Sequence, residues 1–324
     1  MLLALAFGPA PAYVTLTFFA IEPQIMPAAT FARLTDRGVV KVSGADSEKL
    51  LQGLITNDLE GLSSNTACHA ALLSPQGKIL FDFFVVRVGD GYLLDVVAAK
   101  AADLVKRLTM YKLRADVTIA DVGLAHTVCA DWGSGVPPPG ATERGIRFAD
   151  PRHPSMGLRI LEKIPAIDKR FPGLESAHSD YDAVRVRLGV PEGGKDYDFG
   201  DSYPHEADFD IFNGVSFTKG CYVGQEVVAR MQNKTVVRKR VVKISGSAPP
   251  CSGADVLIGE VAIGRVGTVA GSEALAMLRL DRAIAAAQQG QPLTSAGVTV
   301  VGDAEALERY RRSAVARAAA ANPT

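Results

Sequence analysis

The sequence predicts an α+β protein that ends in a small β-barrel. In the N-terminal part, strand-like hairpins alternate with amphipathic helical segments, which is typical of an α+β module. Beyond residue 235, short strands follow one another with glycine-containing turns, a pattern that favours a small barrel. The length of 324 residues is enough for two or three domains of ordinary size.

The first structured segments are a short strand and a helix. Val39–Val42 is predicted as the strand. Asp46 or Ser47 can cap a helix whose apolar face is formed by Leu50, Leu51, Leu54 and Ile55. The polar run Thr56-Asn57-Asp58 then ends this helix.

Two predicted hairpins and a helix complete the N-terminal part. The turn at 74–77 and the turn at 89–91 separate strand-like runs of apolar residues. The predicted strands are 68–73, 79–88, 92–97, 117–119 and 127–130. Residues 100–111 are predicted as a helix with Leu104, Val105 and Leu108 facing inward.

The second half begins after a break in composition. Residues 133–145 are rich in glycine and proline and are predicted as a loop or linker. Ser179 and Asp182 form a candidate capping box for a helix that buries Tyr181 and ends at Gly189. Residues 192–218 fit no regular period. The strands predicted beyond them are 236–245, 256–258, 261–269, 275–280 and 298–300, followed by a terminal helix at 303–321.

These patterns divide the chain into five regions. They are an N-terminal extension at 1–25, an α+β module at 26–132, a middle module at 133–235, a barrel at 236–302 and a terminal helix or tail at 303–324. The first 21 residues are apolar and uncharged, so a membrane anchor and a signal segment were both considered. Pro9, Pro11 and the missing positive charge argue against both, and synthesis starting at Met26 is the third interpretation. We expect no stable membrane association.

Charge and cysteine content exclude several classes of protein. Lys+Arg and Asp+Glu are both 35, which argues against a dedicated DNA-binding protein, since that needs a broad basic surface. The four cysteines contain no C-x-x-C pair, so no local zinc or cluster loop is predicted. Cys68, Cys129 and Cys251 are interpreted as structural. Such sparse cysteine favours a reducing compartment, and we expect a cytoplasmic protein.

The most informative segment is Lys219-Gly220-Cys221-Tyr222-Val223-Gly224-Gln225-Glu226. Its two glycines allow a tight turn and a close approach to a ligand. A helix that starts at Gln225, together with Lys219, would favour a thiolate at Cys221. The simpler interpretation is a glycine turn around a buried cysteine.

This segment, continued to Arg230, resembles the signature of the YgfZ family. Other segments at 44–58, 189–191, 204–206 and 213–217 agree with the same family. The resemblance implies a fold like the glycine-cleavage T-protein: a folate-binding body of two α+β modules, followed by a small C-terminal barrel. It also implies tetrahydrofolate or a derivative as ligand, and a function in iron–sulfur cluster assembly or insertion.

The chain departs from the aminomethyltransferases at two positions. Where they carry an aspartate that acts on the folate nitrogen, this chain has Phe81, and Asp82 should face the other side of the strand. Where they carry a glutamate against the pterin, it has Arg187. Neither residue can replace a carboxylate, so transfer by the T-protein mechanism is not expected.

The resemblance also suggests site residues. Cys221 is the candidate functional thiol, and the candidate folate-binding residues are Asn57, Asp58, Tyr181, Glu206, Lys219, Gly220, Gly224, Gln225, Glu226 and Arg230. Asn57 and Asp58 could instead cap a helix, and Tyr181 could be a core residue. Five cations, Lys234, Arg238, Lys239, Arg240 and Lys243, are either a solvated strand face or a site for a polyanion such as a polyglutamyl folate tail or RNA.

The function expected from the resemblance is that of a folate-binding accessory protein for 4Fe–4S clusters. Its partners would be the cluster assembly machinery and client 4Fe–4S proteins, with indirect support of tRNA modification. The alternative is a folate-dependent one-carbon transferase or demethylase.

Overall fold

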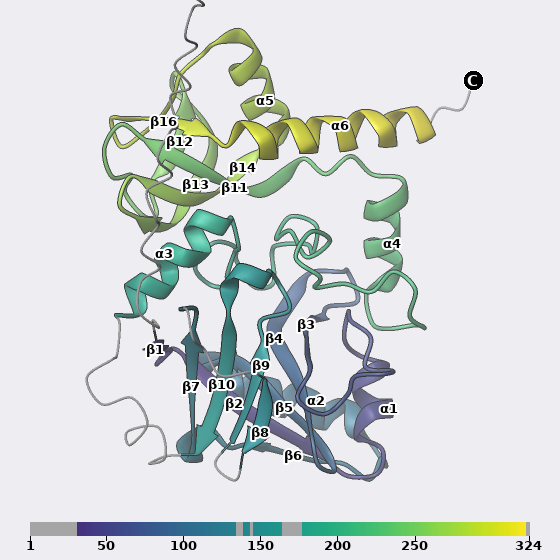
Figure 1. Cartoon of the computed structure of the whole chain (residues 1–324). Coiled ribbons are helices and arrows are strands. Elements are labelled where there is room, and N and C mark those ends of the chain that lie inside the picture. The colour runs from purple at the N-terminus through teal and green to yellow at the C-terminus, as the bar shows by residue number, and fades with distance from the viewer. Residues whose placement is uncertain (1–30, 134–138, 143–144, 164–176, 322–324) are drawn as a thin grey trace, which may run out of the picture.

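The structure is a computed structural model that describes residues 31–133, 139–142, 145–163 and 177–321. Two antiparallel sheets with their helices form the lower part of Figure 1, and a closed barrel lies above them. The predicted extension at 1–25 and much of the predicted linker at 133–145 lie outside the described residues.

The first sheet has five strands in the order β3-β4-β5-β2-β6. Their bounds are β2 Arg37–Ser43, β3 Ala67–Leu73, β4 Ile79–Val88, β5 Gly91–Val97 and β6 Thr118–Asp121. Helices α1 (Ser47–Gln52) and α2 (Ala101–Lys112) cover one face, because Leu51, Leu104 and Leu108 are buried in the core formed there. This part follows the predicted order of strands and helices.

The second sheet has the order β1-β7-β10-β9-β8 and takes strands from both sides of residue 133. Its strands are β1 Phe31–Arg33, β7 His126–Asp131, β8 Gly140–Thr142, β9 Gly145–Ala149 and β10 Leu158–Lys163. Val39, Phe84 and Val86 of the first sheet share a second core with Val128 and Phe148 of this sheet. The two sheets therefore pack face to face.

Helix α3 (His178–Leu188) lies between this body and the barrel (Figure 1), and it packs against β1 below and two barrel strands above. The predicted capping box at Ser179 is wrong, because Ala177 is the N-cap and the helix starts at His178. The carboxylate of Asp180 accepts a hydrogen bond from the backbone N–H of Ala177 at 3.0 Å, so Asp180 caps the helix. Gly189 ends the helix in the left-handed conformation, as predicted.

The C-terminal strands close into a barrel in the order β11-β14-β13-β12-β15-β16, which confirms the predicted α+β class with a C-terminal barrel. The strands are β11 Lys239–Gly246, β12 Asp255–Ile258, β13 Val261–Ala270, β14 Glu273–Arg279, β15 Leu293–Ser295 and β16 Val298–Gly302. Helices α5 (Leu280–Gln289) and α6 (Ala304–Ala321) pack beside it. The sequence analysis missed β1, β8, β9, β10, α5 and β15, and β8 lies within the predicted linker.

Candidate functional site

The signature segment forms an ordered turn that leads into helix α4 (Gln225–Asn233). Tyr222 faces inward with Val228 in a small core, whereas Cys221 is exposed. The interpretation of Cys221 as a buried packing residue is therefore wrong. A side chain added at Gly220 would meet no atom within 4 Å, so space beside the thiol is open.

Gly224 is needed for the fold of this turn. Its φ is +82°, in the left-handed region, and an added Cβ would lie 2.7 Å from the backbone oxygen of Ser74. This close approach seats the start of α4 against the turn that precedes β4. Gln225 and Glu226 begin α4. The amide of Gln225 donates to the backbone oxygen of Gly220 at 3.4 Å, and Glu226 forms an exposed ion pair with Arg230 at 3.0 Å.

Lys219 holds the other end of the turn. Its ammonium donates hydrogen bonds to the backbone oxygens of Gln52, Ile55 and Asn57, at 2.7–2.9 Å. Burial lowers the pKa of Lys219 to about 8. The ammonium is thus held by the backbone of residues 52–57.

Asn57 and Asp58 lie in the turn after α1, to which Lys219 is bound. The Asn57 amide donates to the backbone oxygens of His69 and Asn213, both at 2.7 Å. The Asp58 carboxylate accepts from the side chain of Gln52 at 2.7 Å, and this hydrogen bond lowers the pKa of Asp58. Asn57 therefore ties the turn after α1 to His69 and Asn213, and Asp58 stabilises the turn itself.

Tyr181 is a core residue. It is 1% exposed, and its hydroxyl accepts hydrogen bonds from Arg152 at 2.8 Å and from Arg159 at 2.6 Å. The Arg159 guanidinium also pairs with Asp95, and Arg152 pairs with Asp150. A buried network of ion pairs thus occupies the space beneath α3, and Tyr181 is not free to stack on a pterin.

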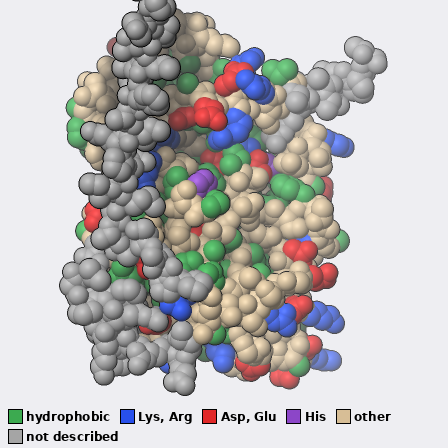
Figure 2. All heavy atoms as spheres, viewed as in Figure 1, with side chains coloured by type: hydrophobic (Ala, Val, Ile, Leu, Met, Phe, Trp, Pro, Cys, Tyr) green, Lys and Arg blue, Asp and Glu red, His purple; other side chains and the backbone are tan. Residues whose placement is uncertain are grey.

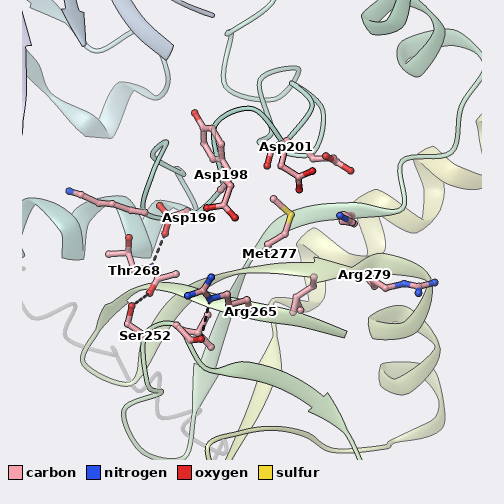
Figure 3. A pocket seen from close by; sticks show the side chains of 18 of the residues that line it. Asp196, Asp198, Asp201, Ser252, Arg265, Thr268, Met277 and Arg279 are labelled. Atoms are coloured by element: carbon pink, nitrogen blue, oxygen red, sulfur yellow. Dashed lines mark hydrogen bonds between the residues drawn. The ribbon is translucent and has the colours of Figure 1, made fainter. Parts of the chain in front are cut away.

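Glu206 lines a cleft of about 850 Å³ between residues 194–206 and the barrel strands β13 and β14. Figure 3 shows Asp198 and Asp201 on the loop side, and Arg265, Met277 and Arg279 on the barrel side. Glu206 accepts a hydrogen bond from the backbone N–H of Tyr203 at 2.9 Å. The barrel wall carries cations, and the loop wall carries carboxylates together with Lys195, which pairs with Asp36 at 2.9 Å.

The five cations at 234–243 do not form one surface. Arg240 is buried and pairs with Asp208 and Asp210, both at 2.7 Å. Lys239 lines the cleft described above, and Lys243 lies between Glu273 and Asp303, at 3.6 and 3.7 Å. Packing against the body separates residues that are adjacent in the sequence.

Phe81 and Asp82 face opposite sides of β4, as predicted. Phe81 is buried in the core beneath α1 and α2. Asp82 accepts hydrogen bonds from the Tyr197 hydroxyl and from the backbone N–H of Gly193. Burial raises the pKa of the Asp82 carboxyl.

The other three cysteines differ in exposure. Cys68 and Cys129 are buried, as predicted for structural residues, and burial raises the pKa of Cys68 to about 12. Cys251 is exposed in a turn of the barrel. Over the described residues, no three His, Cys, Asp or Glu side chains converge on a possible metal position. No helix within the same residues is long and apolar enough to cross a membrane.

Comparison with known proteins identifies similar chains. Residues 238–303 match the family model of the CAF17 C-terminal beta-barrel domain. An iron-sulfur cluster assembly factor IBA57 homolog, mitochondrial, from Mycosarcoma maydis is 38% identical over 245 residues, which are 69% of this chain and 60% of that protein. The mouse iron-sulfur cluster assembly factor IBA57, mitochondrial, is 34% identical over 246 residues, covering 68% of each chain.

A solved structure supports the predicted architecture. The glycine cleavage system aminomethyltransferase T from Bartonella henselae superposes with a TM-score of 0.70 over 86% of each chain, at 14% sequence identity. The likeness confirms a T-protein-like fold and, at this identity, the fold alone.

These comparisons also limit and correct the sequence-based expectations. The chain spans about three fifths of the length of the first similar proteins. The expectation of a cytoplasmic protein is wrong, because the relatives are named as mitochondrial proteins. A low cysteine content separates reducing from oxidising compartments, and does not distinguish one reducing compartment from another.

Proposed function

This chain belongs to the family of the iron–sulfur cluster assembly factor IBA57, and on that basis we propose that it assembles or inserts iron–sulfur clusters with Cys221 as its functional thiol. Its signature segment supports a YgfZ-type member of this family. The clients would be 4Fe–4S proteins, including those on which tRNA modification depends, and the partners would be the proteins that build the cluster.

The observation that carries this proposal is the exposed thiol on a firmly held turn. Lys219 fixes one side of the turn through three hydrogen bonds, and the close packing of Gly224 against Ser74 fixes the other. Cys221 itself is exposed beside the open position at Gly220. Cysteine thiolates are the ligands that iron–sulfur clusters take, so this sulfur can meet a cluster iron or a partner protein.

A complementation experiment tests the proposal. A strain lacking the gene is assayed for 4Fe–4S enzyme activities and complemented with wild type, Cys221→Ala or Cys251→Ala. Cys251 is the matched control, because it is also exposed but lies in the barrel. We expect wild type and Cys251→Ala to restore the activities, whereas Cys221→Ala folds with an unchanged melting temperature and restores none. Full rescue by Cys221→Ala would show that the thiol is not required.

We further propose that the cleft beside Glu206 binds tetrahydrofolate or a derivative. Glu206 and Asp198 line one wall and can accept hydrogen bonds from the N–H groups of a pterin. Lys239 and Arg265 line the opposite wall and can attract the carboxylates of the glutamyl tail. The volume of about 850 Å³ lies within the usual range for small-molecule sites.

Calorimetry with reduced folates tests this second proposal. We expect binding at about micromolar affinity or tighter, corresponding to about −8 kcal/mol. Glu206→Gln should weaken binding by roughly tenfold, since a charged acceptor is lost. Asp255→Asn is the control, because Asp255 is exposed on β12 and does not line the cleft. If wild type gives no heat of binding, folate binding is refuted. The proposal for Cys221 would be unaffected, because the complementation experiment does not depend on folate binding.

The alternative of a folate-dependent one-carbon transferase with the T-protein mechanism has less support. Phe81 is packed in the core, and the Asp82 carboxylate is buried and engaged by Tyr197 and Gly193. Phe81 has no carboxylate, and the Asp82 carboxylate is buried away from solvent, so neither is placed to act on a folate nitrogen. We therefore expect no turnover with aminomethyl-loaded carrier protein and tetrahydrofolate, and measurable product would reverse this conclusion.

A further inference from the structure

The outer face of helix α2, with the turn that follows it, combines exposed apolar and cationic side chains. The helix buries Leu104 and Leu108 against the first sheet, so its opposite side faces solvent. Lys106, Met110 and Leu113 follow one another along that side, at spacings of four and three residues. The helix lies in the lower part of Figure 1, away from the barrel.

Two apolar side chains protrude at the end of this helix. Met110 is 63% exposed and Leu113 is 85% exposed. Their neighbours Tyr111 and Ala115 pack against the core of the first sheet, whereas Met110 and Leu113 do not belong to it. Single exposed apolar side chains are ordinary on a protein surface, but these two are adjacent on one side of one helix end. Packing of the described chain onto itself does not account for them.

The backbone of Leu113 has a conformation that favours glycine. Its φ is +48° and its ψ is −106°, close to the first central residue of a type II′ turn, at about +60° and −120°. A hydrogen bond from the backbone N–H of Ala115 to the backbone oxygen of Lys112, at 2.8 Å, closes this turn. A leucine here is strained, and its exposed side chain recovers little free energy by packing. Strain of this kind is kept at positions that contribute to function.

Cations surround the two apolar side chains. They are Lys106, Arg107, Lys112 and Arg114, and none of them forms an ion pair with another described residue. Of the two acids in the same segment, Asp103 lies in the first turn of α2 and Asp116 follows the turn. Residues 101–116 therefore carry an excess of positive charge, although the whole chain has a formal net charge of zero.

The simpler explanation of this surface is a solvated helix face. It accounts for the cations, but not for a leucine that is both strained and exposed to water. Duplex DNA or RNA would attract the cations, yet a phosphate backbone gives Met110 and Leu113 nothing apolar to bury against. A bilayer with anionic lipids suits both features, since cations meet the headgroup phosphates and apolar side chains enter the boundary with the acyl chains.

We propose that the outer face of α2 and its turn bind reversibly to the surface of an anionic lipid bilayer. Met110 and Leu113 enter the interface, and the four cations lie at the headgroups. This is contact with one leaflet and not a membrane span, so it needs no long apolar helix. The surface contains neither Cys221 nor Glu206, so the proposal does not depend on cluster assembly or on folate binding.

Flotation of the full chain with lipid vesicles tests the proposal. The vesicles are phosphatidylcholine alone and phosphatidylcholine mixed with phosphatidylglycerol. We expect the protein to float with the mixed vesicles and to remain in solution with phosphatidylcholine alone. Because exposed charges are screened by salt, the bound fraction should fall as the ionic strength rises. Equal flotation with both vesicles, or flotation with neither, would overturn the proposal.

The variant Leu113→Gly separates membrane binding from folding. Glycine adopts this backbone conformation without strain, so the melting temperature should stay the same or rise. Vesicle binding should weaken by roughly tenfold, since an apolar side chain is lost from the interface. Val261→Ser is the control, because Val261 is an exposed apolar residue of the barrel (58%), and it should bind as wild type does. Binding of Leu113→Gly at wild-type strength would refute the proposed contact.

Paired charge variants test the cations. The double variant Lys106→Gln with Arg107→Gln should weaken vesicle binding by roughly tenfold. The control is Lys234→Gln with Arg238→Gln, which removes the same charge from exposed residues outside α2 and should leave binding unchanged. Equal losses in the two pairs would show that only net charge matters, and would overturn the assignment to α2. Binding of RNA or polyglutamate at physiological salt, without binding of vesicles, would identify a site for polyanions and also overturn it.

Discussion

The side chain of Lys219 links the signature segment to the turn after α1. Its three hydrogen bonds go to the backbone oxygens of Gln52, Ile55 and Asn57, and Ile55 is fully buried. Loss of a buried donor leaves its acceptors unsatisfied. Lys219→Met should therefore lower the free energy of unfolding by about 2–4 kcal/mol, as measured by urea denaturation.

The lowered pKa of Lys219 predicts that the free energy of unfolding depends on pH. In the folded chain burial lowers the pKa of Lys219 to about 8, whereas the ordinary value is 10.5. Between these values the unfolded chain holds a proton that the folded chain has lost, so the contribution of Lys219 to the free energy of unfolding rises with pH. We expect the stability difference between wild type and Lys219→Met to grow from pH 8 to pH 10. A constant difference would contradict the lowered pKa.

The two glycines of the signature segment have different roles. At Gly224 an added Cβ would collide with the Ser74 oxygen in a left-handed conformation, so Gly224→Ala should cost about 1–3 kcal/mol. At Gly220 the space is open, and Gly220→Ala should change stability by less than about 0.5 kcal/mol. Thermal denaturation of both variants measures the contrast. Equal destabilisation would mean that Gly220 also has a structural role.

At the scale of elements, α3 connects the body to the barrel through Arg185. This side chain is 0% exposed and pairs with Asp182, Glu192 and Asp196 at 2.6–3.1 Å. Asp196 in turn accepts a hydrogen bond from the backbone N–H of Thr268 on β13 at 2.8 Å (Figure 3). Although burial alone would raise the pKa of Glu192, the guanidiniums of Arg185 and Arg37 hold it well below its ordinary value.

Removing this guanidinium leaves buried carboxylates without a partner. Arg185→Leu should lower the free energy of unfolding by about 3–5 kcal/mol. Arg187→Leu, two residues further along the same helix, removes an exposed guanidinium and should cost less than about 0.5 kcal/mol. Denaturant titrations of both variants test this difference. A similar decrease of the free energy of unfolding in both variants would show that the buried ion pairs of Arg185 do not hold α3 in place.

The elements that the sequence analysis missed have identifiable causes. Helix α5 buries the small side chains of Ala283 and Ala286, which give a weak apolar signal. Strand β9 alternates buried and partly exposed residues, whereas β10 is buried almost throughout and includes the polar residues Arg159 and Glu162. Their burial depends on partners in distant segments, so local periodicity did not reveal them.

At the scale of the whole molecule, the formal net charge is zero. Acidic and basic side chains are interspersed over the visible face in Figure 2, without a broad basic surface there. Affinity for duplex DNA depends on cations that displace counterions from phosphates. We therefore expect no retardation of duplex DNA by micromolar protein at physiological salt in a gel-shift assay. Salt-dependent binding would contradict the absence of a basic surface.

The sequence by itself determined the fold class and the barrel. Strand alternation, helical periodicity and glycine turns are local patterns, and they are legible without knowledge of distant contacts. The signature segment likewise pointed to Cys221 as the candidate functional thiol, because a specific run of residues carries the resemblance. Helix α4 begins at Gln225, where the sequence placed it.

Only the tertiary structure decided what most of the candidate side chains do. Packing brings Lys219 onto residues 52–57, places Tyr181 between two buried arginines, and puts Glu206 in a cleft facing the barrel. The physical reason is that hydrogen bonds and ion pairs act over a few ångströms, and the distances between residues far apart in the chain are set by the packing of the sheets, α3 and the barrel.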